Sequence, residues 1–297
     1  MMTSTKTTSR RQILTASAAV LCVFIAPTRV HAQAYQYSVT VLGVVGDNTA
    51  QHVTINASGL VGGPIVNSMN GLETATIWNG TTPTSLPRLA ANYGTTVFGI
   101  NASGQVVGTA SNASGSKTVV WNGLSATPTV LAGASNAFAI NASGKIAGSS
   151  STITAVVWDA MTPAVTPNTL GSLGGNSSIA YGINNAGQVV GFSKTPSGFT
   201  NAVRWNGTAS GTIPTILTGL GGTGTAYAIN ATGQAAGIAY TAGNAAAKAV
   251  IWNGTTPTDL GNLNSNIGSA AYGLNDAGDV IGSSSTAFFT PPGPCMI

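Results

Sequence analysis

Short apolar segments of about four to six residues alternate with segments rich in Gly, Asn, Ser and Thr from residue 37 to residue 290. Apolar runs of this length, bounded by turn-forming residues, predict β-strands. The same order of segments returns about every 45 residues, which is the signature of a repeat architecture. The region is therefore predicted to be one β-rich domain built from repeated units.

A turn motif marks each unit, with Asn at the first position of the turn and Gly at the fourth. Asn can hydrogen-bond its own backbone two residues on, and Gly can take the left-handed conformation that closes a hairpin with a bulge. Some copies also match the N-glycosylation acceptor, but the turn explains the Asn in every copy. The copies are Ile55-Asn56-Ala57-Ser58-Gly59, Ile100-Asn101-Ala102-Ser103-Gly104, Ile140-Asn141-Ala142-Ser143-Gly144, Ile183-Asn184-Asn185-Ala186-Gly187, Ile229-Asn230-Ala231-Thr232-Gly233 and Leu274-Asn275-Asp276-Ala277-Gly278.

Short runs such as Ala180-Tyr181-Gly182 before the turn and Gln188-Val189-Val190-Gly191 after it predict two short strands that flank each turn. Two further strands are expected in each unit. The third strand ends in the tryptophans, one for each of the first five units, and Ala287-Phe288-Phe289 takes that place in the last unit. Four of the tryptophans precede Asn-Gly, which predicts a two-residue hairpin turn. The fourth strand carries a Leu-Gly pair, as in Thr169-Leu170-Gly171. The tryptophans are Trp78, Trp121, Trp158, Trp205 and Trp252.

Four short antiparallel strands per unit is the strand count of a propeller blade. The predicted fold is therefore all-β and propeller-like, with six blades over residues 35–290 and a short tail over 291–297. The segment 39–46, near the start of the repeat region, matches the Leu-Gly strand, whereas Ala287-Phe288-Phe289 near the end matches the tryptophan strand. Pairing of these two chain ends is expected to close the ring and remove two free sheet edges. An open solenoid of the same units is the alternative, although it needs capping repeats that the sequence does not display.

The tryptophans have a structural and a functional interpretation. Each comes at the same point of the unit, at the end of a strand and just before a tight turn. We favour packing between neighbouring blades, where burial of a Trp side chain contributes an upper bound of about 4 to 6 kcal/mol. The alternative is a row of exposed rings that stack on sugars.

The first 34 residues have the pattern of a secretory signal peptide. Basic residues including Arg10 and Arg11 precede an apolar run over 13–26, and small residues suit cleavage after Ala32 or Ala34. The run reaches only about 21 Å as a helix, short of the ~30 Å hydrocarbon core, so no transmembrane anchor is expected. The paired arginines resemble a twin-arginine signal, and both export routes stay open. The mature protein is expected outside the cell, in the periplasm or at the cell surface.

Charge is scarce once the leader is removed. The whole chain has ten Lys and Arg against six Asp and Glu, but four of the basic residues belong to the leader. The chain without its leader therefore has six charges of each sign and lacks the excess of basic residues typical of a nucleic-acid binder. Low charge also favours self-association. Cys295 is the one mature cysteine, so no internal disulfide is possible.

Candidate catalytic groups are few, and we assign no catalytic, cofactor or metal residue. His52 is the one mature histidine and is interpreted as a neutral strand residue. Glu73 and Asp159 are conceivable partners for glycoside hydrolysis, although nothing in the sequence brings them together. Asp276 and Asp279 flank one turn, but the other units supply too few oxygen ligands there for calcium.

A glycine-rich segment, 219–224, formally matches the dinucleotide-binding fingerprint. It is one copy of the Leu-Gly strand, and no helix is expected after it to present a phosphate-binding terminus. We interpret it as part of the repeat.

The repeated Ala-Tyr-Gly-Ile-Asn, Gly-Gln-Val-Val-Gly, Ala-Val-x-Trp and Leu-Gly-x-Leu-Gly-Gly segments resemble the HAF repeat of probable extracellular bacterial proteins. That family is named for a His-Ala-Phe run, where this chain has Ala-Val-x-Trp or, in the last unit, Thr286-Ala287-Phe288. The resemblance covers nearly all of residues 37–290. It implies an exported repeat protein of unknown biochemical role, with no catalytic residues to transfer.

Export, a repeat scaffold and an uncharged surface together indicate a non-catalytic binding or adhesion module for a glycan or another envelope component. A structural component of the cell surface or matrix is the alternative, suggested by low charge and repetition. A carbohydrate-active hydrolase is a distant third. The ligand, the oligomeric state and whether the C-terminus is native are not set by the sequence.

Overall fold

The structure is a computed structural model that describes residues 53–67, 69–263 and 268–284, together with Leu42 and three short strands nearer the N-terminus. Those strands are β1 (Arg11–Gln12), β2 (Cys22–Phe24) and β3 (Ser38–Val39), of which β1 and β3 pair in parallel. The described part of the chain is all-β except for one 3-10 turn, η1 (Ala242–Asn244). No helix within it has the length and apolar character needed to cross a membrane.

Five four-stranded sheets follow one another along the chain, and we call each a blade. Blade 1 contains β4 (Thr54–Ile55), β5 (Leu60–Val66), β6 (Glu73–Asn79) and β7 (Thr82–Ser85). Blade 2 contains β8 (Thr95–Ile100), β9 (Gln105–Asn112), β10 (Gly115–Asn122) and β11 (Thr129–Val130). Blade 3 contains β12 (Ala134–Ile140), β13 (Lys145–Ser150), β14 (Ala155–Asp159) and β15 (Asn168–Thr169).

The remaining blades follow in the same order. Blade 4 contains β16 (Ser178–Ile183), β17 (Val189–Lys194), β18 (Thr200–Trp205) and β19 (Pro214–Ile216). Blade 5 contains β20 (Gly221–Ile229), β21 (Ala235–Thr241), β22 (Ala247–Asn253) and β23 (Thr256–Asp259). Blade 6 contains β24 (Ser269–Leu274) and β25 (Val280–Ser284), with β2 paired along the free edge of β25.

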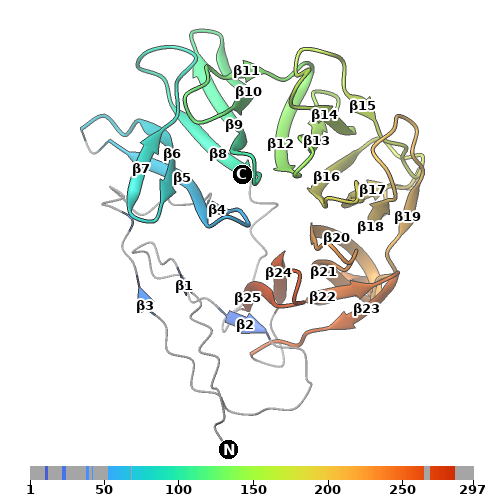
Figure 1. Cartoon of the computed structure of the whole chain (residues 1–297). Helices are drawn as coiled ribbons and strands as arrows, with labels where there is room; N and C mark the ends of the chain where they lie inside the picture. Colours follow the sequence, from blue (N-terminus) through green and yellow to red (C-terminus); the bar gives the residue numbers. More distant parts are fainter. Residues whose placement is uncertain are drawn as a thin grey trace, which may run out of the picture.

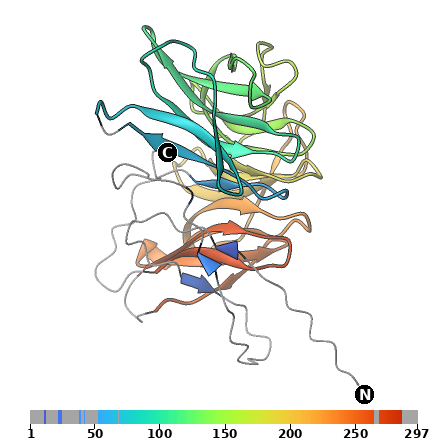
Figure 2. The same ribbon diagram turned by 60° about the vertical axis from the view of Figure 1, so that its left-hand side comes forward.

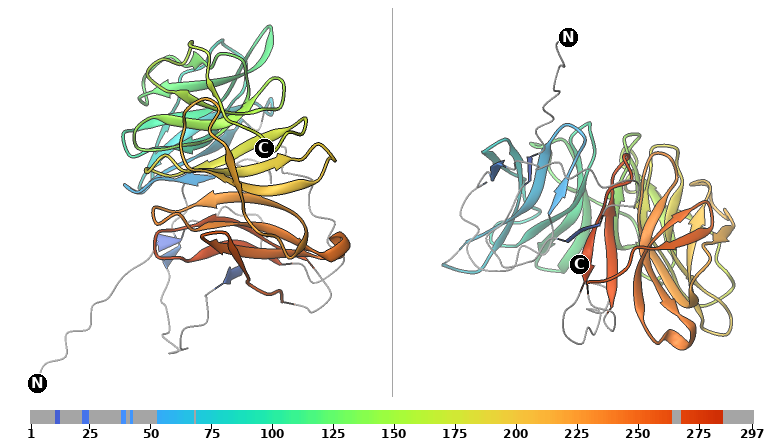
Figure 3. Two further views of the ribbon diagram at one scale, coloured as in Figure 1. Left: turned by 90° about the vertical axis from the view of Figure 1, so that its right-hand side faces the viewer. Right: turned by 90° about the horizontal axis from the view of Figure 1, so that it is seen from below.

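The blades are arranged as in a propeller. Within each of blades 1 to 5 the strands pair antiparallel in sequence order, so the first strand lies at one edge of the sheet and the fourth at the other. The first strands, from β4 to β24, gather around a common centre, and each lies beside the first strand of the next blade (Figure 1). Successive blades lie face to face when seen from the side (Figures 2 and 3). This confirms the propeller-like prediction. Residues 287–289 lie outside the described residues, so their predicted pairing with 39–46 is not observed. At Val39 the partner is Gln12 of β1, and β2 pairs with β25.

Both faces of a blade are buried. In β9, Val106 packs in the core between blades 1 and 2, whereas its neighbour Val107 packs in the core between blades 2 and 3. Because successive strand residues point to opposite faces, a sheet buried on both faces needs unbroken apolar runs. This explains why runs such as Val-Val recur in place of an alternating pattern.

The tryptophans close these cores. Trp121, Trp158, Trp205 and Trp252 are at most 2% exposed, and each belongs to the core that its blade shares with the preceding one. The prediction that tryptophans pack between blades is confirmed for these four, and the sugar-stacking alternative is wrong for them.

The predicted Asn-to-Gly hairpins are present in all six copies. In the fourth, the Gly187 N–H donates to the Asn184 carbonyl at 3.1 Å, and Gly187 has a φ of 76°. The Asn184 Oδ1 accepts from the backbone N–H of Gln188 at 2.9 Å, so the side chain holds the start of the next strand. These bonds are local, as the turn chemistry requires.

The same asparagines also join the blades. Each Nδ2 group donates to the backbone carbonyl of the equivalent Asn in the following blade, at 2.9–3.1 Å, and we call this set the asparagine ladder. It runs from Asn56 to Asn101, Asn141, Asn184, Asn230 and Asn275. The four middle asparagines are at most 5% exposed, so the three bonds that join them are made out of water.

The Asn-Gly prediction after tryptophan is wrong in detail. In blade 1, Asn79 still pairs with Thr82, so the two-residue turn consists of Gly80 and Thr81. Blade 5 repeats this arrangement, with Asn253 paired to Thr256. In blades 2, 3 and 4 the fourth strand begins later in the sequence, so the loop after the third strand is longer than two residues.

Substitution of Asn184 by Ala removes a ladder bond and the bond that holds Gln188. We expect the free energy of unfolding to fall by about 3 kcal/mol, because buried partners are left without hydrogen bonds. Urea unfolding of the purified protein measures the change. Asn253→Ala, at an exposed position that ends β22, is the matched control and should change stability by less than about 0.5 kcal/mol. Equal effects of the two substitutions would contradict the ladder's role.

Candidate functional site

We call the first strand of each blade its inner strand. In blades 2 to 6 the inner strand contains a β-bulge. In blade 4, Ala180 pairs with Gly191 and Gly182 pairs with Val190, which leaves Tyr181 without a partner on β17. The residue that the strand register skips three positions before the ladder Asn is aromatic in each of these blades. We call these five residues the aromatic row: Phe98, Phe138, Tyr181, Tyr227 and Tyr272.

The bulge depends on a glycine in the neighbouring strand. A Cβ atom on Gly191 would lie 1.8 Å from the carbonyl oxygen of Ile179, the residue two before Tyr181. The equivalent glycines of blades 2, 3, 5 and 6 have the same carbonyl at 1.9–2.1 Å. Bulges commonly redirect a side chain next to a functional site. The Gly of the repeated Gln-Val-Val-Gly segment therefore makes room for the backbone that presents the aromatic row.

The rings of the row contact one another from blade to blade. Ring centroids are 4.9 Å apart for Phe138 and Tyr181, 5.3 Å for Tyr181 and Tyr227, and 5.7 Å for Tyr227 and Tyr272, with tilted or edge-on planes. These separations and tilts are those that aromatic pairs prefer. Tyr181 contacts rings of both the preceding and the following blade, so its side chain projects from the inner edge of the sheet and not from one face.

The row keeps part of its surface open. Tyr272 is 41% exposed, and the other four side chains are half-buried. Burial raises the pKa of Tyr181 to about 12, so its hydroxyl stays neutral. The inner strands of five consecutive blades thus carry uncharged, partly exposed aromatic side chains, and those of blades 3 to 6 are in ring contact. Aromatic side chains of this kind are common in small-molecule sites.

The row was missed in the sequence, although a signal was present. Segments such as Ala180-Tyr181-Gly182 were interpreted only as strands that flank the turn. An aromatic residue three positions before Asn, followed after the turn by Gly in the second strand, occurs in five of the six copies. Only blade 1 departs from it, with Val53 at that position.

The conceivable hydrolase pair is not brought together. Glu73 begins β6 of blade 1, where its Oε2 accepts a hydrogen bond from the Thr96 hydroxyl at 2.9 Å. Asp159 ends β14 of blade 3, so blade 2 stands between the two carboxylates and they occupy opposite ends of their strands. Two carboxylates that cleave a glycosidic bond must flank it closely.

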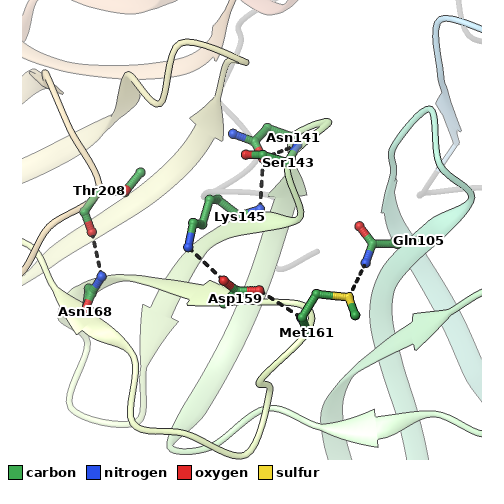
Figure 4. Close-up of polar contacts among 8 residues, drawn as sticks. All are labelled: Gln105, Asn141, Ser143, Lys145, Asp159, Met161, Asn168 and Thr208. Carbon is green, nitrogen blue, oxygen red and sulfur yellow. Dashed lines mark hydrogen bonds and ion pairs between the residues drawn. The ribbon is translucent and has the colours of Figure 1, made fainter.

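Asp159 instead forms an ion pair with Lys145, whose Nζ lies 2.8 Å from Oδ2 (Figure 4). Hydrogen bonds from Lys145 and from the Met161 backbone N–H lower the pKa of Asp159. Blade 2 has the neutral pair Gln105 and Asn122 at the equivalent positions. The two charged side chains also line a polar cavity of about 210 Å3 beside Trp158 and the 162–168 loop.

The remaining candidate residues have structural roles or fall outside the described part of the chain. Asp276 Oδ1 accepts from the Ala231 backbone N–H, and Asp279 Oδ2 accepts from Asn275 Nδ2. Among the described residues, no group of three His, Cys, Asp or Glu side chains could hold a metal. The segment 219–224 leads into strand β20, not into a helix. His52 and Cys295 lie outside the described residues.

Comparisons with known proteins were made on this fold. No protein-family model matches the chain, and no curated protein matches it. Among solved structures it is similar to the β-propeller domain of the trilobed protease from Pyrococcus furiosus, with 15% sequence identity, coverage of 76% of each chain and a TM-score of 0.49. A function for this chain therefore has to be argued from its own side chains.

Substitution of Gly191 by Ala tests the bulge that presents Tyr181. Because the added methyl group meets a backbone carbonyl, we expect a loss of about 3 kcal/mol in unfolding free energy, together with a change in near-ultraviolet circular dichroism from the row. Gly207→Ala is the control, since its nearest neighbour is a flexible Thr212 side chain at 3.7 Å. A stable Gly191→Ala protein with an unchanged aromatic spectrum would show that the glycine is not needed for the bulge.

The Asp159 ion pair predicts a small dependence of stability on pH. The folded-state pKa is lowered, so the stabilisation is present above the unfolded pKa of about 3.8 and is lost as the pH falls through the folded value. The pair is about a third exposed, so Asp159→Asn should cost less than about 1 kcal/mol near neutral pH. The double variant Lys145→Gln with Asp159→Asn recreates the neutral pair of blade 2 and should lose this pH dependence. Urea titrations at several pH values measure both.

Proposed function

We propose that the chain is an exported, non-catalytic binding module whose aromatic row receives a neutral ligand with apolar faces, such as the sugar rings of a glycan. One observation carries the proposal: five consecutive inner strands each carry a partly exposed aromatic ring, and the rings of blades 3 to 6 contact one another from blade to blade. Aromatic side chains offer a large rigid surface at low entropic cost, and Tyr adds a hydroxyl for hydrogen bonding.

The charge of the site supports a neutral ligand. The row has no ionisable group other than tyrosine hydroxyls, and burial raises the pKa of Tyr181 to about 12. The six basic and six acidic residues after residue 34 leave no excess charge that would attract an acidic or basic partner from a distance. Ligand specificity therefore comes from ring stacking and a few hydroxyl contacts.

The outer edges of the blades favour a binding module over a structural matrix component. A self-assembling protein would present long, regular edge strands to its neighbours. Here the outermost strands have two to four residues, and three of them contain proline, which lacks the N–H donor needed to extend a sheet. They are β7 (Thr82–Ser85), β11 (Thr129–Val130), β15 (Asn168–Thr169), β19 (Pro214–Ile216) and β23 (Thr256–Asp259).

In this proposal the ring has six blades and the chain ends complete the sixth. Blade 6 takes two strands from its own repeat, β24 and β25, where the other blades take four. The Ala287-Phe288-Phe289 segment matches the tryptophan strand and, once the leader is removed, would replace β2 (Cys22–Phe24) along β25. The 39–46 segment matches the Leu-Gly strand. Cleavage after Ala32 or Ala34 during export leaves the 39–46 segment close to the new N-terminus.

A glycan array followed by titration calorimetry tests the ligand class. We expect a neutral oligosaccharide to bind, and Tyr227→Ala to weaken binding roughly tenfold, since a ring contact is worth about 1.4 kcal/mol. Phe199→Ala is the matched control, because Phe199 is 49% exposed but lies beside β18, away from the inner strands.

The outcomes separate the possibilities. Binding that Phe199→Ala weakens as much as Tyr227→Ala would place the ligand elsewhere on the surface. A folded protein that binds no neutral glycan, while an acidic or basic ligand binds at the row, would overturn the ligand class.

A further inference from the structure

The ladder asparagines of blades 2, 4, 5 and 6 make a further side-chain bond inside their own hairpin. In blades 2, 4 and 5 the Asn Nδ2 also donates to the Oε1 of the Gln four residues on, at 2.7–2.9 Å. In blade 6 the acceptor is a carboxylate, since Asn275 Nδ2 donates to Asp279 Oδ2 at 2.9 Å. One amide hydrogen therefore serves the ladder, and the other is paired with a side-chain oxygen.

Blade 3 has Lys145 at this position, and an ammonium group cannot accept a hydrogen bond. Asn141 Nδ2 donates to the Asn184 carbonyl at 3.0 Å, and its second hydrogen has no acceptor among the described residues. Because Asn141 is only 4% exposed, this hydrogen is a buried donor, and such a donor is costly to leave unpaired. Lys145 Nζ bonds to Asp159 and has further N–H groups to donate.

The hairpin of the next blade also differs at this point. A Cβ atom on Gly233 would lie 2.9 Å from Gln188 Oε1, so the Gln oxygen of blade 4 packs against the hairpin glycine of blade 5. Gly187 has the same relation to Lys145, but the nearest atom to its Cβ position is Cγ2 of Thr208 at 3.7 Å. The lysine side chain thus does not take the place that a Gln oxygen takes in the other blades.

We propose that the carboxylate of a small organic acid binds between blades 3 and 4, where it accepts hydrogen bonds from Asn141 Nδ2 and Lys145 Nζ. Figure 4 shows both nitrogens on the side of the hairpin toward Thr208 of blade 4. The Asp279 carboxylate of blade 6 makes the equivalent bond to Asn275, so the hairpin geometry suits a carboxylate. The ammonium group strengthens the contact, because hydrogen bonds between charged partners are the strong ones.

The cavity beside the ion pair limits the rest of the ligand. It measures about 210 Å3, and Lys145 and Asp159 line it together with Thr162, Thr166 and Asn168. Hydroxyl and amide groups of this kind favour a short acid with hydroxyl groups over a long apolar chain. The site shares no residue with the aromatic row, so it does not rest on the proposed function.

Titration calorimetry of the full chain with lactate, glycerate and gluconate tests the site, with lactamide as the neutral probe. We expect at least one of the acids to bind and lactamide to bind roughly tenfold more weakly. Lys145→Gln should abolish the binding and leave urea unfolding unchanged, because the new Gln supplies the accepting oxygen within the chain. Lys117→Gln is the matched control, since it removes the same charge from β10 of blade 2 and should bind as the parent does.

Two further measurements locate the ligand. Asp159→Asn should tighten binding several-fold, because Lys145 is then no longer shared with a second carboxylate. On 15N-labelled protein the side-chain amide signals of Asn141 should shift during the titration, and those of Asn230 should stay unchanged.

The inference is overturned if the folded protein binds none of the acids, if lactamide binds as tightly as lactate, or if Lys145→Gln and Lys117→Gln bind equally. Shifts at Asn230 and not at Asn141 would also contradict it. A blank glycan array concerns the aromatic row alone, so each proposal can fail without the other.

Discussion

In each of blades 2 to 5 one buried asparagine makes two sets of hydrogen bonds, and the arrangement of the blades depends on both. Its carbonyl and Oδ1 oxygens shape the hairpin of its own blade, while its Nδ2 reaches the carbonyl of the next asparagine, 40 to 46 residues away. Adjacent inner strands are thereby held at a fixed spacing. Their bulges then fall at one level, and the aromatic residues of successive blades come into ring contact.

Local chemistry made much of the fold predictable. The Asn-to-Gly hairpins depend on residues within one turn, and the tryptophan strands are unbroken apolar runs, so both could be recognised along the sequence. The turn after Trp78 was misplaced by one residue because Asn79 keeps its strand pairing, which depends on the opposite strand and not on the Asn-Gly pair itself. The loops of blades 2 to 4 could not be predicted either, because their length depends on which residues of the fourth strand pair with the third strand.

The candidate site was less accessible to sequence reasoning. An aromatic residue in a short strand has the ordinary composition of a buried strand, and nothing within one repeat reveals that Tyr181 is left unpaired. The bulge appears only when β16 is set against β17 with its close Gly191 backbone. The second bond of each ladder asparagine was missed for the same reason, since its partner belongs to another repeat.

The sequential strand order of the blades has a consequence for how such a protein changes over generations. Blades 2 to 5 are each drawn from one uninterrupted stretch of chain, and all meet their neighbours through the same donor and acceptor groups. Duplication or loss of one complete repeat in the gene would therefore add or remove a whole blade and leave matching contacts on either side. The number of blades around the common centre can thus change in a single genetic event without redesign of the contacts between them.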